Sequence, residues 1–204
     1  MTIYHWILFA AFSIFFLYFL YNLILTLVKK GLPDPSEKKG NVNAAIIYSF
    51  TSAMSPAKKE SAFLHLPTYV AGMIFHLGTF FSFFWLIILF FNFRIVAWCH
   101  WTSSLILIIT SICGISILIK RIAKKNLRQM SNPDDYFSNL LVSGFQILMA
   151  IAILWNKASA PLFIYTAFLF LYIPFGKLKH TIYFFSSRIY LGKFFGKRGV
   201  WPVK

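Results

Sequence analysis

The chain consists of long apolar runs separated by short polar and basic segments. No run alternates apolar and polar residues like the strands of an outer-membrane barrel, and several reach the about twenty residues that a membrane-spanning helix needs. The pattern predicts helices at about 3–28, 61–93, 95–119, 136–155 and 160–176, and a basic amphipathic tail at 177–204. We therefore expect an all-α polytopic membrane protein, a single domain 1–204 that forms a five-transmembrane-helix bundle.

Helix-breaking and capping residues mark the ends of these runs. Pro33 and Pro35 exclude a continuation of the first helix. Asn132 and Pro133, followed by two aspartates, begin the fourth helix, and Pro161 opens the fifth. The first run is too long and too aromatic for a cleaved signal peptide, so we expect a retained helix there.

The composition separates this chain from soluble domains. Of its 204 residues, 59% are hydrophobic, 20% are aromatic and only 12% are charged, and the mean hydropathy is +0.70. A soluble domain has about 25% charged residues. Cys99 and Cys113 share one apolar run without metal-ligand spacing, so we expect them to be small buried apolar residues.

The positive charges are concentrated on one side of the predicted membrane. The net charge of +15 comes from 20 Lys and Arg against 5 Asp and Glu. Six of the basic residues lie between the first two helices, five follow the third and seven follow the fifth, whereas the opposite loops hold only Arg94 and Lys157. The positive-inside rule then predicts an outside N-terminus and a cytoplasmic C-terminus in the cell inner (cytoplasmic) membrane. This basic surface, which includes Lys58 and Lys59, would contact an acidic partner or anionic lipid headgroups.

Two of the five histidines, His76 and His180, are predicted to lie at similar depth near the cytoplasmic face. A hydrocarbon core about 30 Å thick takes about twenty helical residues. His76 lies eighteen residues before Arg94, and His180 lies twenty residues after Ala160. Two imidazoles from different helices at one level suit the two axial ligands of one haem iron. Two interfacial histidines without a ligand are the alternative.

The neighbours of these histidines are compatible with a haem site. Gly72 and Gly78 lie on the helix of His76, where a missing side chain lets a flat macrocycle approach the backbone, although close helix packing explains the same glycines. Basic residues near His180 could pair with haem propionates, or could simply extend to the interface. These residues are Lys177, Lys179 and Arg188.

The other histidines are secondary candidates for a second haem or for quinone contacts. His65 lies eleven residues before His76, on the same helical face, and would project into the cytoplasmic interface. His5 and His100 lie near the outer face and could form an outer ligand pair. Because tryptophans surround them in the sequence, an aromatic belt is the alternative explanation.

Three short motifs carry a family resemblance. FHLG in the second predicted helix, followed by PFGKLKH and RIYLG after the fifth, resembles the gamma subunit of membrane-bound respiratory nitrate reductases. It is also similar to the related cytochrome b subunits of heterodisulfide-reductase-like membrane complexes. The resemblance implies a five-helix haem b protein that passes electrons between a membrane quinone and a cytoplasmic-side iron–sulfur subunit. His76 and His180 then take the positions of the ligands of the haem nearer that partner.

The chain departs from the family at two positions. Two-haem members carry a further histidine in each of two helices, and here Leu86 and Leu162 stand at those positions. The departure implies one haem b instead of two. His65, or the pair of His5 and His100, would be the only routes to a second haem.

These expectations describe an electron-transfer subunit of a quinone-linked oxidoreductase complex with other membrane subunits, since so short a chain has no room for a catalytic domain. A haem-free membrane anchor or assembly subunit explains the topology equally well, but leaves His76 and His180 without a role. A transporter would need polar or broken helices near the midplane. The mild polar residues of the third helix do not supply these: Ser103, Ser104, Thr110 and Ser111.

Overall fold

The computed structural model describes residues 2–28, 34–58 and 63–203. Helices account for 83% of the structure, and no strand occurs within those ranges. The all-α prediction is therefore confirmed for the described residues. Pro33, Lys59 and the predicted start of the second helix at residue 61 lie outside them.

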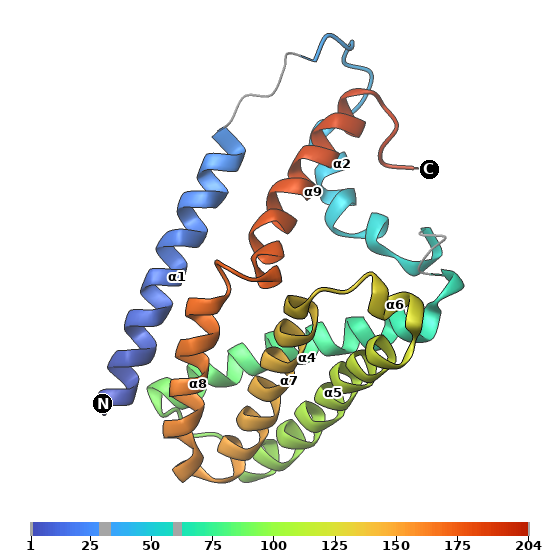
Figure 1. Ribbon diagram of the computed structural model, residues 1–204. Helices are drawn as coiled ribbons and strands as arrows, with labels where there is room; N and C mark the ends of the chain where they lie inside the picture. The colour runs from blue at the N-terminus through green and yellow to red at the C-terminus, as the bar shows by residue number, and fades with distance from the viewer. Residues whose placement is uncertain (1, 29–33, 59–62, 204) are drawn as a thin grey trace. The chain divides into compact units, whose positions relative to one another are not determined.

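The helices follow one another with short connections, and Figure 1 shows their course from blue to red. They are α1 Ile3–Val28, α2 Val42–Phe50, α4 Leu66–Phe91, α5 Ala97–Ala123, α6 Lys125–Gln129, α7 Pro133–Leu154, α8 Ser159–Tyr172 and α9 His180–Lys197. Short 3₁₀ helices lie in the connections: η1 Ser52–Met54, η2 Pro56–Lys58, η3 Asn156–Ala158 and η4 Lys177–Lys179. Among the described residues, α1, α4, α5 and α7 are long and apolar enough to span a membrane, and α8 with α9 adds a fifth span if the pair counts as one broken span.

The predicted start of the fourth spanning helix is confirmed in detail. Asn132 caps α7, because its side chain accepts a hydrogen bond from the Asp135 amide at 3.1 Å. The Asp135 carboxylate in turn accepts from the Asn132 amide at 2.9 Å. With Pro133 at the first helical position, this capping box satisfies amides that have no partner inside the helix.

One predicted helix boundary is wrong, and a proline explains it. Helix α8 ends at Tyr172, two residues before Pro174, instead of continuing to residue 176. Helix α4 begins at Leu66, and because the predicted start at residue 61 lies outside the described residues, that boundary stays a prediction. The predicted tail contains a separate helix, α9, which begins at His180.

The chain forms two compact units. The first comprises Met1–Phe15 and Pro67–Leu178, and the second comprises Phe16–Leu66 and Lys179–Lys204. The positions of these units relative to one another are not determined. Each unit is therefore described by itself, and the single bundle stays a prediction.

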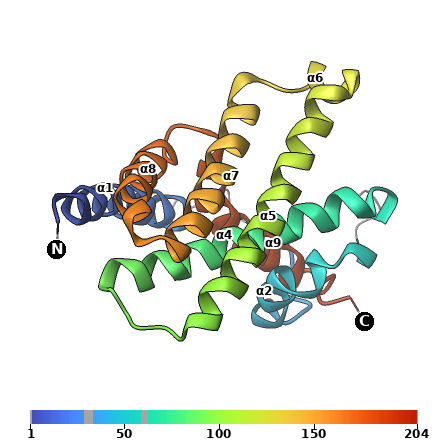
Figure 2. The same ribbon diagram turned by 90° about the horizontal axis from the view of Figure 1, so that it is seen from below.

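Small polar residues line the helix contacts of the first unit. Helices α5 and α7 pack side by side, α8 packs on α7, and α4 crosses α5 and α7 (Figure 2). Ser104 of α5 is buried and donates a hydrogen bond to the Ala150 carbonyl of α7 at 3.0 Å. Small side chains permit this close approach, and hydrogen bonds between helices replace the hydrophobic effect that lipid cannot supply. The serines and threonines of the third predicted helix therefore serve helix packing.

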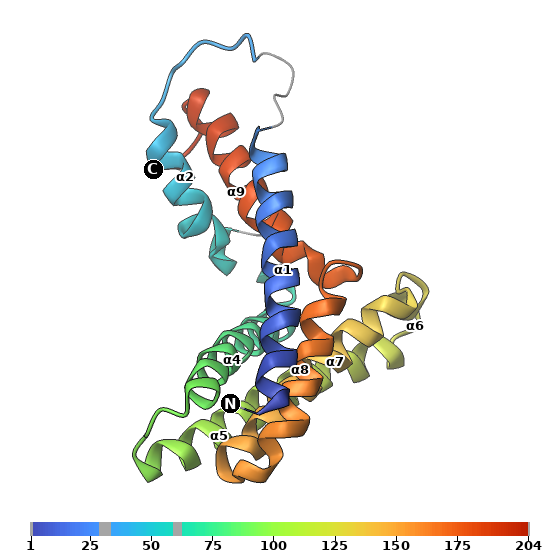
Figure 3. The same cartoon turned by 90° about the vertical axis from the view of Figure 1, so that its left-hand side faces the viewer.

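Glycines allow α2 and α9 of the second unit to pack closely. Helix α2 lies along α9, as Figures 1 and 3 both show. A Cβ on Gly192 would lie 2.5 Å from the Ile46 Cα, and Gly196 faces Ala45 and Val42 just as closely. Because a larger residue at Gly192 would collide with backbone, this spacing of four residues fixes how α9 packs on α2.

A polar clasp joins the segment before α2 to the end of α9. Both guanidinium nitrogens of Arg198 donate to the carboxylate of Asp34 at 3.0 Å, and the Arg198 guanidinium lies 3.6 Å from the ring centre of Phe194. The Lys197 ammonium donates to the Asp34 carbonyl at 2.7 Å. The Lys39 amide donates to the Lys197 carbonyl, also at 2.7 Å. Bidentate arginine–carboxylate pairing is geometrically specific, so the clasp fixes the register of these segments.

We expect this clasp to loosen in acid. Hydrogen bonding from Ser36 and the Arg198 guanidinium lower the pKa of Asp34 to about 2. Because the unfolded value is about 3.9, the contribution of Asp34 to stability is present above about pH 4 and is lost as the pH falls through the folded value. The measurement is the protection factor of the Lys39 amide in hydrogen exchange, which should fall between about pH 4 and 2. In Asp34→Asn the protection factor should be low and unchanged over that window; an equal fall there would contradict the assignment.

Candidate functional site

His76 lies on the surface of α4, next to a residue of the core. Phe75 is buried in the first unit, whereas His76 is exposed. Successive helical residues are about 100° apart around the helix axis, so a core-facing Phe75 places the neighbouring imidazole at the edge of the packed face. The imidazole is therefore exposed on the first unit, with its ring centre 6.1 Å from that of Phe75.

One side chain of α7 holds the turn of α4 that carries His76. Gln146 is fully buried, and its Nε2 donates to the Phe75 carbonyl and to the Thr79 Oγ1, both at 2.9 Å. Its Oε1 accepts a hydrogen bond from the Thr110 Oγ1 of α5 at 2.8 Å. Helices α4, α5 and α7 thus meet in one hydrogen-bond network in which both amide hydrogens and the amide oxygen have partners.

The two glycines near His76 have different surroundings. Gly78 packs directly against Thr110. Close helix packing, the alternative to haem contact, therefore accounts for this glycine. Gly72 lies one turn before His76, and no heavy atom of the described chain lies within 4 Å of the place where its Cβ would be. The face of α4 at Gly72 has room for a Cβ, and the role of Gly72 beside a flat group stays a prediction.

His180 is the first residue of α9, and its side chain is exposed. The depth count from Ala160 assumed one uninterrupted helix, and the break between Tyr172 and Lys177 removes that assumption. His76 belongs to the first unit and His180 to the second. The pairing of the two imidazoles therefore stays a prediction.

The three basic residues that were predicted near haem propionates belong to different units. The Lys177 ammonium pairs with the Asp135 carboxylate at 2.6 Å within the first unit, which leaves it less suited to a propionate. Lys179 is exposed beside His180 at the start of α9. The guanidinium carbon of Arg188 lies 5.5 Å from the ring centre of Phe184. Lys179 and Arg188 share the second unit with His180 and stay candidates.

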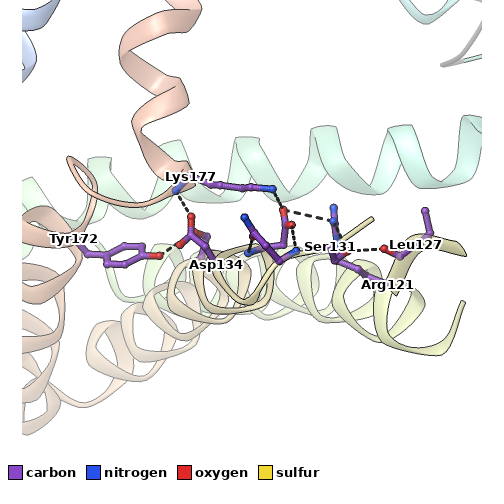
Figure 4. Close-up of polar contacts among 9 residues, drawn as sticks. Arg121, Leu127, Ser131, Asp134, Tyr172 and Lys177 are labelled. Carbon is purple, nitrogen blue, oxygen red and sulfur yellow. Dashed lines mark hydrogen bonds and ion pairs between the residues drawn. The ribbon is translucent and has the colours of Figure 1, made fainter. Parts of the chain in front are cut away.

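A charged network surrounds the start of α7, and Figure 4 shows Lys177 and Arg121 reaching it from two sides. The Asp135 carboxylate lies 3.5 Å from the Arg121 guanidinium in addition to its pair with Lys177. The Lys177 amide donates to the Asp134 carboxylate. The two aspartates thus bind Lys177, which precedes His180 by three residues.

His5 and His100 contact aromatic rings from other parts of the chain. The ring of His5 lies 4.8 Å from that of Phe163 and 5.3 Å from that of Phe90. The ring of His100 lies 5.3 Å from that of the buried Trp85. These are the contacts of an aromatic belt at the ends of spanning helices.

His65 is an exposed turn residue immediately before α4. A turn at His65 separates it from the helix of His76, and the prediction that both lie on one helical face stays a prediction.

Leu86 and Leu162, which stand where the two-haem proteins of the resembled family carry ligands, belong to the apolar core. Leu86 is 7% exposed, and Leu162 is fully buried. Cys99 and Cys113 are free and half-buried. In the part of the chain that the structure describes, no group of three or more His, Cys, Asp or Glu side chains could hold a metal ion, a criterion that a haem with two axial ligands does not need to meet.

Comparisons with known proteins add no relative. No protein-family model matches the chain, and neither the curated proteins nor the solved structures contain a significant match. The resemblance to nitrate reductase gamma subunits therefore rests on the short motifs around His76 and His180.

Sequence reasoning missed Gln146. A signal was available, because a lone amide in the apolar run of α7 must find a partner on another helix when lipid surrounds the bundle. The sequence could not identify which helix supplies that partner, since Phe75 contributes only a backbone carbonyl.

We expect Asp135→Ala to lower the free energy of unfolding by about 1–2 kcal/mol, because it removes the reciprocal cap of α7 and leaves Lys177 and Arg121 without their shared carboxylate. Thermal unfolding of the purified protein in detergent measures this change. Glu37→Ala is the matched control: the Glu37 and Lys39 side chains are 86% and 69% exposed, at 4.0 Å, so their pair contributes little. Equal stabilities of the two variants would contradict a structural role for the network.

Proposed function

We propose that this chain is a membrane cytochrome b subunit that relays electrons between the membrane quinone pool and an iron–sulfur partner subunit on the cytoplasmic side. The proposal extends the motif resemblance with the local structure at His76. The observation that carries it is an exposed imidazole on a turn of α4 that buried hydrogen bonds hold in place.

Two histidines would supply the nitrogen ligands of the proposed haem iron. His76 and His180 are both exposed, and the surface at Gly72 is open one turn before His76. When bound, haem supplies a one-electron iron couple whose potential depends on its axial ligands and its burial. Each histidine would contribute one ring nitrogen, which leaves no iron position for a substrate. Lys179 and Arg188 would neutralise the propionates.

The described surroundings of Leu86 and Leu162 favour one haem b per chain. Both leucines contribute to the packed core of the first unit, so apolar side chains occupy the level at which a second ligand pair would be expected. His5 and His100 pack against aromatic rings, as residues of an aromatic belt would.

The charge distribution supports a cytoplasmic partner. Lys120 and Arg121 lie in the last turn of α5, where cations favour the negative end of the helix dipole. Further basic residues follow on α6 and α9. In the cell inner membrane, with the N-terminus outside and the C-terminus on the cytoplasmic side, these basic residues would face an acidic iron–sulfur subunit or anionic lipid headgroups.

The ligand assignment predicts the spectrum of the purified complex. We expect a haem b spectrum with one haem per chain by quantitation, and its loss in His76→Ala and in His180→Ala separately. His100→Ala should retain the spectrum, since His100 packs on Trp85. A spectrum retained in either ligand variant would refute the pairing. A wild-type complex without haem would leave the membrane anchor as the function.

Quinone coupling is a separate expectation. Because both axial positions would be filled, the haem can exchange electrons with a quinol only from outside its coordination sphere. We expect menaquinol or ubiquinol to reduce the haem in isolated membranes, measured by difference absorbance. Membranes with His76→Ala are the control, and a wild-type haem that dithionite reduces but neither quinol does would contradict the coupling.

A further inference from the structure

Gln146 is a buried polar side chain that the proposed electron relay does not use. Its amide reaches two groups on α4 and one on α5, and all three distances are 2.8–2.9 Å. In an apolar surrounding an unpaired amide is costly, since neither lipid nor the core offers a partner. The network therefore favours one arrangement of α4, α5 and α7 over arrangements in which the amide would lose its partners.

The two groups that Gln146 contacts on α4 lie on either side of His76 in the sequence. The Phe75 carbonyl precedes the histidine by one residue, and the Thr79 hydroxyl follows it by three. Thr79 also donates to the Phe75 carbonyl at 2.9 Å, so both contacts belong to a single helical turn. A rotation of α4 that moved His76 would break both hydrogen bonds from Gln146.

A second possible motion of α4, sliding along α5, is limited by close packing. Gly78 of α4 packs against Thr110, and Gly114 of α5 packs against the ring of Phe75. Packed helix surfaces tend to have discrete arrangements instead of a continuous range. The hydrogen bonds of Gln146 thus select the arrangement, and the glycine contacts keep α4 and α5 close together.

We propose that Gln146 is a positioning residue for His76: its amide sets the rotation of α4 and thereby the direction in which the imidazole is presented. This inference rests on the proposed function, because the presented group is the haem ligand. Gln146 would touch neither the haem nor its iron, and it would act only through the turn from Phe75 to Thr79.

Replacing Gln146 by leucine should leave the fold intact. The Thr110 Oγ1 lies 3.0 Å from the Leu107 carbonyl of its own helix, and the Thr79 hydroxyl already donates to Phe75. Neither hydroxyl is stranded when the amide is removed. Replacing a polar side chain by an apolar one of similar size is nearly neutral when no partner is left unsatisfied.

The experiment compares Gln146→Leu with the wild type in the purified full-length complex. Low-temperature electron paramagnetic resonance reports the orientation of axial imidazoles, and redox titration reports the midpoint potential. We expect the variant to broaden or shift the low-spin signal and to change the potential, or to lose haem while it keeps its helical circular dichroism. Thr79→Val removes one of the two contacts on α4 and should shift the signal in the same direction by a smaller amount.

Ser104→Ala is the matched control. Ser104 is also buried and also joins α5 to α7, but it donates its hydrogen bond to the Ala150 carbonyl of α7 and not to a group of α4. Its spectrum and potential should equal those of the wild type. A Gln146→Leu variant with the wild-type signal and potential would overturn the inference and leave the cytochrome function standing. A wild-type complex without haem would end both. If Gln146→Leu does not fold, an unchanged signal in Thr79→Val overturns the inference.

Discussion

A polar side chain buried among apolar helices has only protein groups as partners, and Gln146 meets this constraint by joining three helices. The arrangement of α4, α5 and α7 follows from that requirement, because both amide hydrogens and the amide oxygen are satisfied together. Ser104, another buried polar residue, likewise has a protein partner across the α5–α7 contact, the Ala150 carbonyl. The first unit is thus specified by a few hydrogen bonds within a large apolar contact, whose side chains alone would permit several packings.

The second unit uses a different device. Glycines such as Gly192 let α9 lie against α2, and the half-buried ion pair of Asp34 with Arg198 fixes the register at one end. This unit carries His180 at the first turn of α9, while the first unit carries His76.

Much of the helical arrangement could be predicted from the sequence, because lipid-spanning runs and caps are local signals. The first helix and the capped start of α7 at Asn132 appear where the pattern places them. The end of α8 lies before the predicted residue 176 because of Pro174, since hydropathy does not register the missing amide of a proline. The pairing at Gln146 could not be predicted, because its main partner is a backbone carbonyl that no side-chain pattern reveals. The packing of α9 through Gly192 was hidden for a related reason, as glycine contributes no hydropathy.

The central claim is that His76 and His180 bind one haem between them. An experimental density map of the purified complex tests this most directly. We expect a flat macrocycle with its iron bonded to one ring nitrogen of each histidine. Lipid or protein side chains between the two rings, or rings too far apart to share an iron, would contradict the account.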